Sequence, residues 1–169
     1  NFWINIKSQG FTQNQVVFKF FNQEVQSGIV CFVNEETGLY YVNVLMVNQG
    51  NFLLEKAQVS IDEFQNININ VSSISGFREV SFLINGNKVK SVSIFSNKLI
   101  DNQFDEKLKE VDTKLTIGSS ENLSITLSGQ VYSFTNFKGY LDEFRYFKDI
   151  CTFEFVKNHM HKNIFSQDK

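Results

Sequence analysis

The sequence contains no proline, a single alanine at position 57, and only two arginines, Arg78 and Arg145. Asparagine, lysine, isoleucine and phenylalanine are abundant instead, and because their codons are rich in A and T, the base composition of the genome explains this bias. The asparagines alternate with apolar residues and do not cluster, which argues against a prion-like segment.

The chain also lacks an excess of positive charge, since its formal net charge is -2 and its pI is about 5.7. This balance argues against a nucleic-acid-binding surface and against a patch for anionic membranes. No apolar run approaches the roughly 20 residues of a membrane span, so no membrane insertion by this segment is expected. No signal peptide is visible, and strand-like sequence begins at once. We therefore expect one domain over residues 1–169, a fragment or module of a larger protein.

Histidine and cysteine are scarce, which limits the possible chemistry. A Ser or Cys nucleophile would need a histidine base, but the two histidines, His159 and His161, lie near the end of the chain, where surface positions are expected. No glycine-rich phosphate loop occurs, and the cysteine spacing fits no metal site. Cys31 and Cys151 have apolar neighbours, so buried free thiols are favoured, and a single disulfide remains the alternative in an oxidising compartment.

What the chain does contain is 42% hydrophobic residues, with 19 phenylalanines, in many short alternating segments broken by turn signals. This pattern predicts an all-β fold, a two-layer antiparallel β-sandwich. Asn85-Gly86 between two alternating runs is the strongest hairpin signal. The expected strands are Phe2–Ile6, Val16–Phe21, Gly28–Val33, Leu39–Val47, Phe64–Val71, Arg78–Ile84, Lys88–Ile94, Leu115–Ile117, Ser124–Leu127 and Val131–Phe134. A short helix is expected within Phe153–His161.

The cleanest alternation lies in Phe64–Val71. It places isoleucine and valine on one face and Asn66, Asn68 and Asn70 on the other. Amides both donate and accept hydrogen bonds, so this ladder could bind a sugar, although a solvated or internally hydrogen-bonded strand face is the more common arrangement.

The segment with the most specific sequence is Phe137–Phe155, FKGYLDEFRYFKDICTFEF. In an extended chain Leu141 lies on the side opposite Phe144. Gly139 fits a bend or a close backbone approach. Asp142 and Arg145 are the charged residues most expected to be drawn inside, with Asp142 fixing a corner or, alternatively, forming a ligand or metal site.

This segment resembles the closing motif of laminin-G-like jelly-roll domains in the concanavalin A-like lectin/glucanase superfamily. The family has an Asp-Glu-aliphatic-Arg strand after F-x-G, then an "aliphatic-Ser-x-Glu" turn that Cys151, Thr152 and Glu154 match, with Cys151 in place of the usual Leu. Four further segments resemble family strands in the right order, so the similarity covers nearly the whole chain. They are Phe2–Ile6, Phe64–Ser72, Val80–Val89 and Leu115–Gly118.

The resemblance implies a jelly-roll, concanavalin A-like sandwich that binds glycan or protein through rim loops or the concave sheet face, sometimes with calcium. It implies a non-catalytic recognition module of an extracellular or cell-surface protein. The alternative is a structural domain packed inside a large multi-protein assembly, which would be compatible with an intracellular location. Glucanases of this superfamily need two carboxylates about 5 Å apart. The nearest match, Glu110-Val111-Asp112, lacks the second Glu, so no enzyme activity is expected.

Candidate ligand-binding residues lie in three expected loops, Asn34–Gly38, Asn48–Asn51 and Ser96–Lys114, because function usually resides on loops held by a rigid scaffold. They are Asn34, Glu35, Glu36, Asn48, Gln49, Asn51, Asp101 and Asp105. The third loop lacks the residue spacing of an EF-hand, so calcium binding is the less favoured interpretation of this loop. Two sequons, at Asn70 and Asn122, give possible glycosylation sites.

Overall fold

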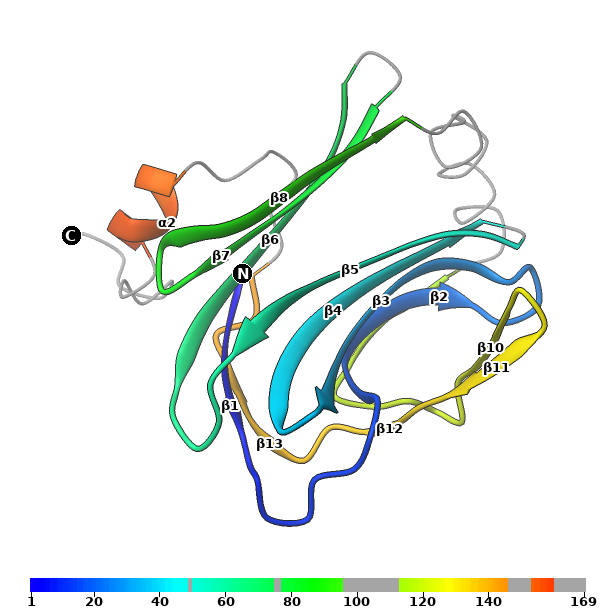
Figure 1. Cartoon of the computed structure of the whole chain (residues 1–169), viewed down its shortest axis with the longest axis horizontal. Helices are drawn as coiled ribbons and strands as arrows, with labels where there is room; N and C mark the ends of the chain where they lie inside the picture. The colour runs from blue at the N-terminus through cyan, green and yellow to red at the C-terminus, as the bar shows by residue number, and fades with distance from the viewer. Residues whose placement is uncertain (49, 75–76, 96–112, 146–152, 160–169) are drawn as a thin grey trace.

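The computed structural model describes residues 1–48, 50–74, 77–95, 113–145 and 153–159 (Figure 1). Within these residues the chain folds as packed antiparallel sheets, which confirms the expected all-β sandwich. Every expected strand is present, with ends shifted by at most a few residues. No helix in this part of the chain is long and apolar enough to cross a membrane.

The smaller sheet has five strands in the order β13-β1-β6-β7-β8. Its strands are β1 (Phe2–Ile6), β6 (Gln65–Ile74), β7 (Phe77–Ile84), β8 (Asn87–Phe95) and β13 (Gly139–Asp142). The expected hairpin joins β7 to β8, and both Asn85 and Gly86 have positive φ, at 51° and 76°. Asparagine and glycine tolerate these angles, which matches the tight two-residue turn.

The larger sheet has the order β12-β2-β3-β4-β5, and β9 also pairs with β2. Its strands are β2 (Gln15–Asn22), β3 (Ser27–Glu36), β4 (Leu39–Asn48), β5 (Asn51–Val59), β9 (Leu115–Ile117) and β12 (Thr135–Asn136). The expected central strand is β3, which is apolar on both faces and pairs with β2 and β4. All pairs in this sheet are antiparallel except the short contact of β12 with β2.

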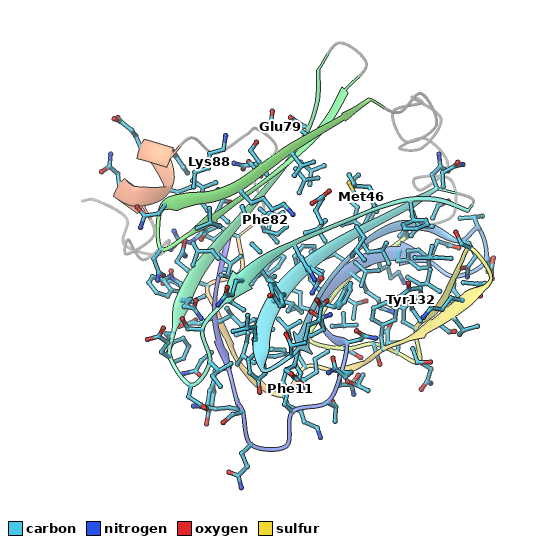
Figure 2. All side chains as sticks on the ribbon, in the orientation of Figure 1. Phe11, Met46, Glu79, Phe82, Lys88 and Tyr132 are labelled. Atoms are coloured by element: carbon cyan, nitrogen blue, oxygen red, sulfur yellow. The ribbon has the colours of Figure 1, made fainter. Side chains whose placement is uncertain are left out.

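The main hydrophobic core lies between the two sheets. Met46 of β4 and Phe82 of β7 are fully buried there and come from opposite layers (Figure 2). Alternate residues of each strand supply the rest of this core, as the two-residue period of a strand requires. Its fully buried members include Phe2, Ile4, Ile6, Val17, Cys31, Val33, Val42, Val44, Ile67 and Val80.

A second core forms on the opposite face of the larger sheet, where the hairpin of β10 (Ser124–Leu127) and β11 (Gln130–Ser133) covers it (Figure 1). Leu123, Ile125 and Leu127 are buried against Phe32 and Leu45. The hairpin covers only part of the face, because the strands beneath it continue beyond its reach. The uncovered part of this face forms the floor of the site described below.

The outer face of the smaller sheet is partly covered by the helix α2 (Phe153–His159), whose Val156 packs on Leu83. Asn66 and Asn68 lie on this face and are fully buried, so the Asn ladder is not a solvated strand face. Asn66 exchanges side-chain hydrogen bonds with Asn1, at 2.9 and 3.2 Å. The buried amides are therefore paired within the protein, as buried polar groups require.

The expected alternation fails at the end of β13. Glu143 has a φ of 48°, in the left-handed region, and Phe144 packs in the same core as Leu141. The ring of Phe144 stacks on Phe2, with centroids 6.0 Å apart. The prediction that Phe144 faces away from Leu141 is therefore wrong, because a single left-handed residue resets the two-residue period.

Two further boundaries differ from expectation. β3 continues to Glu36, so Asn34, Glu35 and Glu36 are strand residues, and the turn itself is Thr37-Gly38. β5 occupies a segment whose mixed polar and apolar sequence did not predict a strand. It is the edge strand of its sheet, where one row of side chains remains partly exposed.

Candidate functional site

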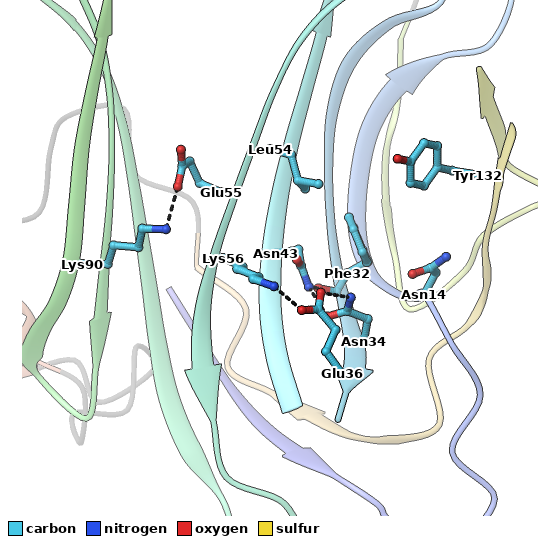
Figure 3. A pocket seen from close by; sticks show the side chains of 10 residues that line it. All are labelled: Asn14, Phe32, Asn34, Glu36, Asn43, Leu54, Glu55, Lys56, Lys90 and Tyr132. Carbon is cyan, nitrogen blue, oxygen red and sulfur yellow. Dashed lines mark hydrogen bonds and ion pairs between the residues drawn. The ribbon is translucent and has the colours of Figure 1, made fainter. Parts of the chain in front are cut away.

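A groove of about 370 Å³ lies on the larger sheet beside the β10–β11 hairpin and reaches the β5 edge (Figure 3). Its floor consists of side chains from β3, β4 and β5, which point to the same face because opposed residues of antiparallel strands share a side. The groove is lined by Asn14, Phe32, Asn34, Glu36, Asn43, Leu54, Glu55, Lys56, Lys90 and Tyr132.

A continuous polar network runs across the floor from β4 to β3 and on to β5. The buried Asn43 donates from Nδ2 to Oδ1 of Asn34 at 2.8 Å. Asn34 in turn donates from Nδ2 to Oε1 of Glu36 at 3.0 Å. Lys56 donates from Nζ to the other oxygen of the same carboxylate, Oε2 (Figure 3). Each polar side chain is thus held in place by another member of the network, and the ion pair of Glu36 with Lys56 crosses over β4.

The charges in this network are fixed by their partners. The pKa of Glu36 is held below its ordinary value, chiefly because Lys56 donates a hydrogen bond to the carboxylate and further because Asn34 does so. The Lys56 ammonium also lies over the ring of Tyr41, 4.5 Å from its centroid. Glu36 is therefore an ionised acceptor and is unsuited to donate a proton as a catalytic acid.

Apolar surface flanks the polar floor. Phe32 meets Phe134 edge to face with centroids 5.2 Å apart, which fixes the ring at the hairpin side of the groove. Leu54 is 38% exposed and Tyr132 is half-buried. At the β5 edge, Glu55 pairs with Lys90 of the other sheet at 2.7 Å (Figure 3). The groove therefore offers amides, paired charges and apolar surface together.

The structure brings together only some of the candidate residues. Asn34 and Glu36 line the groove, but Glu35 points to the other face, where its carboxylate accepts a hydrogen bond from Gly38 N at 2.6 Å. Asn48 and Asn51 lie at the opposite end of the ten-residue strand β4. At about 3.4 Å per residue the two turns are about 30 Å apart, so they cannot contact one small ligand together.

Other candidates are not placed. Gln49, Asp101 and Asp105 lie outside the described residues, as does Cys151. Among the residues that are described, no three His, Cys, Asp or Glu side chains are grouped closely enough to hold a metal ion. A calcium requirement stays a prediction of the resemblance. Of the two sequons, Asn122 is exposed, and Asn70 is half-buried and accepts a hydrogen bond from Asn68.

The charged residues of the closing motif take different positions. Gly139 allows a close backbone approach, since a Cβ there would lie 2.4 Å from the carbonyl oxygen of Asn5. Arg145 is drawn inside and pairs with Glu143 at 2.5 Å. Asp142 is exposed, which corrects the expectation that it is buried, because β13 is an edge strand and this position faces outward. Its carboxylate accepts a hydrogen bond from Glu143 N at 2.8 Å.

Comparisons with protein-family models, with curated proteins and with solved structures gave no match.

Sequence reasoning missed Asn43, Lys56 and Tyr132, which the fold places in the groove. A signal for one of them was present, because Asn43 interrupts the otherwise apolar run LYYVNVLMV. A buried amide in such a run requires a partner, and the register sets Asn43 directly opposite Lys56.

Proposed function

We propose that this chain is a non-catalytic recognition module that binds a glycan in the groove on the larger sheet. The observation that carries the proposal is the network of Asn34, Glu36 and Lys56 beside exposed apolar side chains. Sugar hydroxyls both donate and accept hydrogen bonds, as amides do, and the C–H face of a sugar ring is apolar. A site with fixed polar groups and apolar walls suits such a ligand.

The balance of charge in the groove narrows the ligand class. Glu36 is paired with Lys56, and Glu55 with Lys90, so no unpaired charge of either sign is presented among the lining residues. An anionic glycan would have to displace a carboxylate from its lysine. A neutral glycan needs no such exchange, and it is the ligand class we propose.

The resemblance to laminin-G-like domains also supports a recognition module that binds a ligand, because it implies a binding role for the concave sheet face or the rim loops. It also supports placing the parent protein outside the cell or on its surface. The lowered pKa of Glu36 supports a non-catalytic role, since a glycosidase acid needs a raised pKa.

The alternative, an interaction domain inside a multi-protein assembly, is favoured by a different observation. The edge strand β5 leaves Phe52 and Leu54 exposed, at 41% and 38%. Exposed apolar side chains on a sheet edge are typical of protein contacts.

The test is a glycan array that carries neutral, sialylated and sulfated glycans, read with calcium and with a chelator. Glu36→Gln should reduce binding to the preferred neutral glycan by about tenfold, since one fixed charged acceptor is lost. Asp62→Asn is the matched control, because Asp62 also accepts hydrogen bonds and pairs with a lysine, Lys7, but on the rim away from the groove. Binding restricted to anionic glycans, or equal loss in both variants, would overturn the proposal.

A further inference from the structure

The sheet edges of this protein are unequal in how well they are protected against pairing with another strand. Unpaired edges carry free backbone N–H and C=O groups, and natural proteins usually shorten them, bulge them or place lysines on them. The edge strands β9, β12 and β13 have only three, two and four residues. β8 is long, but it carries Lys88 and Lys90 and a register shift against Phe82/Leu83.

The edge of β5 is neither short nor bulged, and its single lysine, Lys56, is paired with Glu36. It is nine residues long, its pairing with β4 is unbroken from Asn48↔Asn51 to Tyr40↔Val59, and the chain has no proline. Within the described residues no strand pairs with its outer side. The only charged residues of β5, Glu55 and Lys56, are both engaged in ion pairs inside the protein.

The register identifies the free backbone groups. Asn48 and Asn51 close a two-residue turn, so their backbone groups face each other across the hairpin. Hydrogen-bonded and non-bonded pairs alternate along an antiparallel ladder. Leu53 and Glu55 therefore bond β4, whereas Phe52, Leu54 and Lys56 direct their N–H and C=O groups outward. The exposed side chains belong to these same outward-facing residues.

We propose that the free edge of β5 binds an extended peptide segment of a partner protein as an additional strand. Backbone hydrogen bonds would supply affinity, and alternate apolar side chains of the peptide would pack beside Phe52 and Leu54, as in other cases of strand addition. Nine residues of strand extend over about 30 Å. This surface shares Leu54 and Lys56 with the glycan groove but extends along the whole of β5 and uses a different ligand chemistry.

Charge favours a peptide over a second copy of the chain. β8 lies next to β5, as the contact between Lys90 and Glu55 shows. Two copies that joined their β5 strands in one continuous sheet would bring the two β8 strands together, with Lys88 and Lys90 near their own equivalents. A single peptide strand brings no second β8 and avoids this repulsion.

The test uses a phage-displayed library of random decapeptides selected on the folded chain, followed by synthesis of the selected peptides. Hydrogen exchange of single amides is then measured by NMR with and without peptide. The proposal expects new protection at Phe52, Leu54 and Lys56, while Leu53 and Glu55 are protected already. Protection elsewhere, or no selectable peptide, overturns it.

Phe52→Lys should weaken peptide binding by about tenfold, the loss expected when one apolar contact is removed. Phe64→Lys is the matched control, since Phe64 is 52% exposed and does not belong to β5. Equal loss in both variants contradicts the proposal. A second copy of the chain at the β5 edge would also contradict the proposal. It would appear as concentration-dependent dimerisation in analytical ultracentrifugation, together with protection of the same amides in the absence of peptide. Tyr132→Ala changes the groove on the hairpin side and keeps the ion pair of Lys56 with Glu36. It should leave peptide binding unchanged, which separates this result from the glycan test.

Discussion

Gly28 lies at a close approach of the backbones of strands β2 and β3, and its replacement tests the register that positions the groove. Its φ is 142°, a conformation that L side chains rarely adopt. A Cβ at this position would lie 2.2 Å from the carbonyl oxygen of Phe20 and 2.5 Å from Cα of Phe21. Both atoms belong to the backbone of the neighbouring strand, so no side-chain rotation relieves the overlap.

The cost of Gly28→Ala follows from two contributions. Backbone strain of this kind costs about 1–3 kcal/mol. Forcing extra volume into a packed sheet costs about 1–3 kcal/mol more. We therefore expect a loss of about 2–6 kcal/mol in the free energy of unfolding, which is a large part of the 5–15 kcal/mol typical of a domain.

Urea denaturation followed by tryptophan fluorescence measures this loss through the single residue Trp3. Gly129→Ala is the matched control, because Gly129 also has a positive φ, 81°, but a Cβ there meets no atom within 4 Å. The control should lose only about 1 kcal/mol of strain energy. If both variants lose the same amount, the close approach of β2 and β3, and with it the register beneath the groove, is wrong.

Two further predictions concern ionisable groups. Because the pKa of Glu36 is lowered in the folded chain, its ion pair stabilises the fold above the ordinary carboxyl pKa and is lost as pH falls through the lowered value. In the variant Glu36→Gln, the free energy of unfolding should therefore fall less steeply as pH is lowered than in the unsubstituted chain. An equal dependence of the free energy of unfolding on pH in both proteins would contradict the ion pair of Glu36 with Lys56. Cys31 is fully buried and its pKa is raised by burial, so iodoacetamide should not modify it until the sandwich unfolds. Modification as fast as that of a free thiol under native conditions, located by peptide mass spectrometry, would refute its place in the core.

Much of the fold could be predicted because alternation is a local signal. Ile67 and the residues around it follow the two-residue period, and Asn85-Gly86 can adopt the positive φ angles of a tight hairpin turn. The two-residue alternation of side chains is lost where one residue takes a left-handed backbone conformation, as Glu143 does. No local sequence pattern indicates that Glu143 takes this conformation. The strand β5 escaped prediction because its alternation is broken: Phe52 and Leu54 are apolar on the exposed face, and Glu55 is charged on the face that carries Leu53 and Ala57.

The candidate site could be predicted only in part. Asn34 and Glu36 were found because they belong to an expected loop, Asn34–Gly38, but the loop at Asn48 and Asn51 lies at the other end of strand β4. Which turns share an end depends on strand pairing across the sheet. Lys56 became part of the site only through its register with Asn43, a relation that sequence distance does not show.

The most direct test of the proposed groove is an NMR titration of the isotope-labelled chain with the neutral glycan that binds best on the array. We predict shifts of the amide signals of Asn34, Asn43 and Lys56, with no change at Asn48 or Asn51. Shifts confined to the turn at Asn48 and Asn51 would contradict the account, because they would place recognition at the opposite end of the sheet.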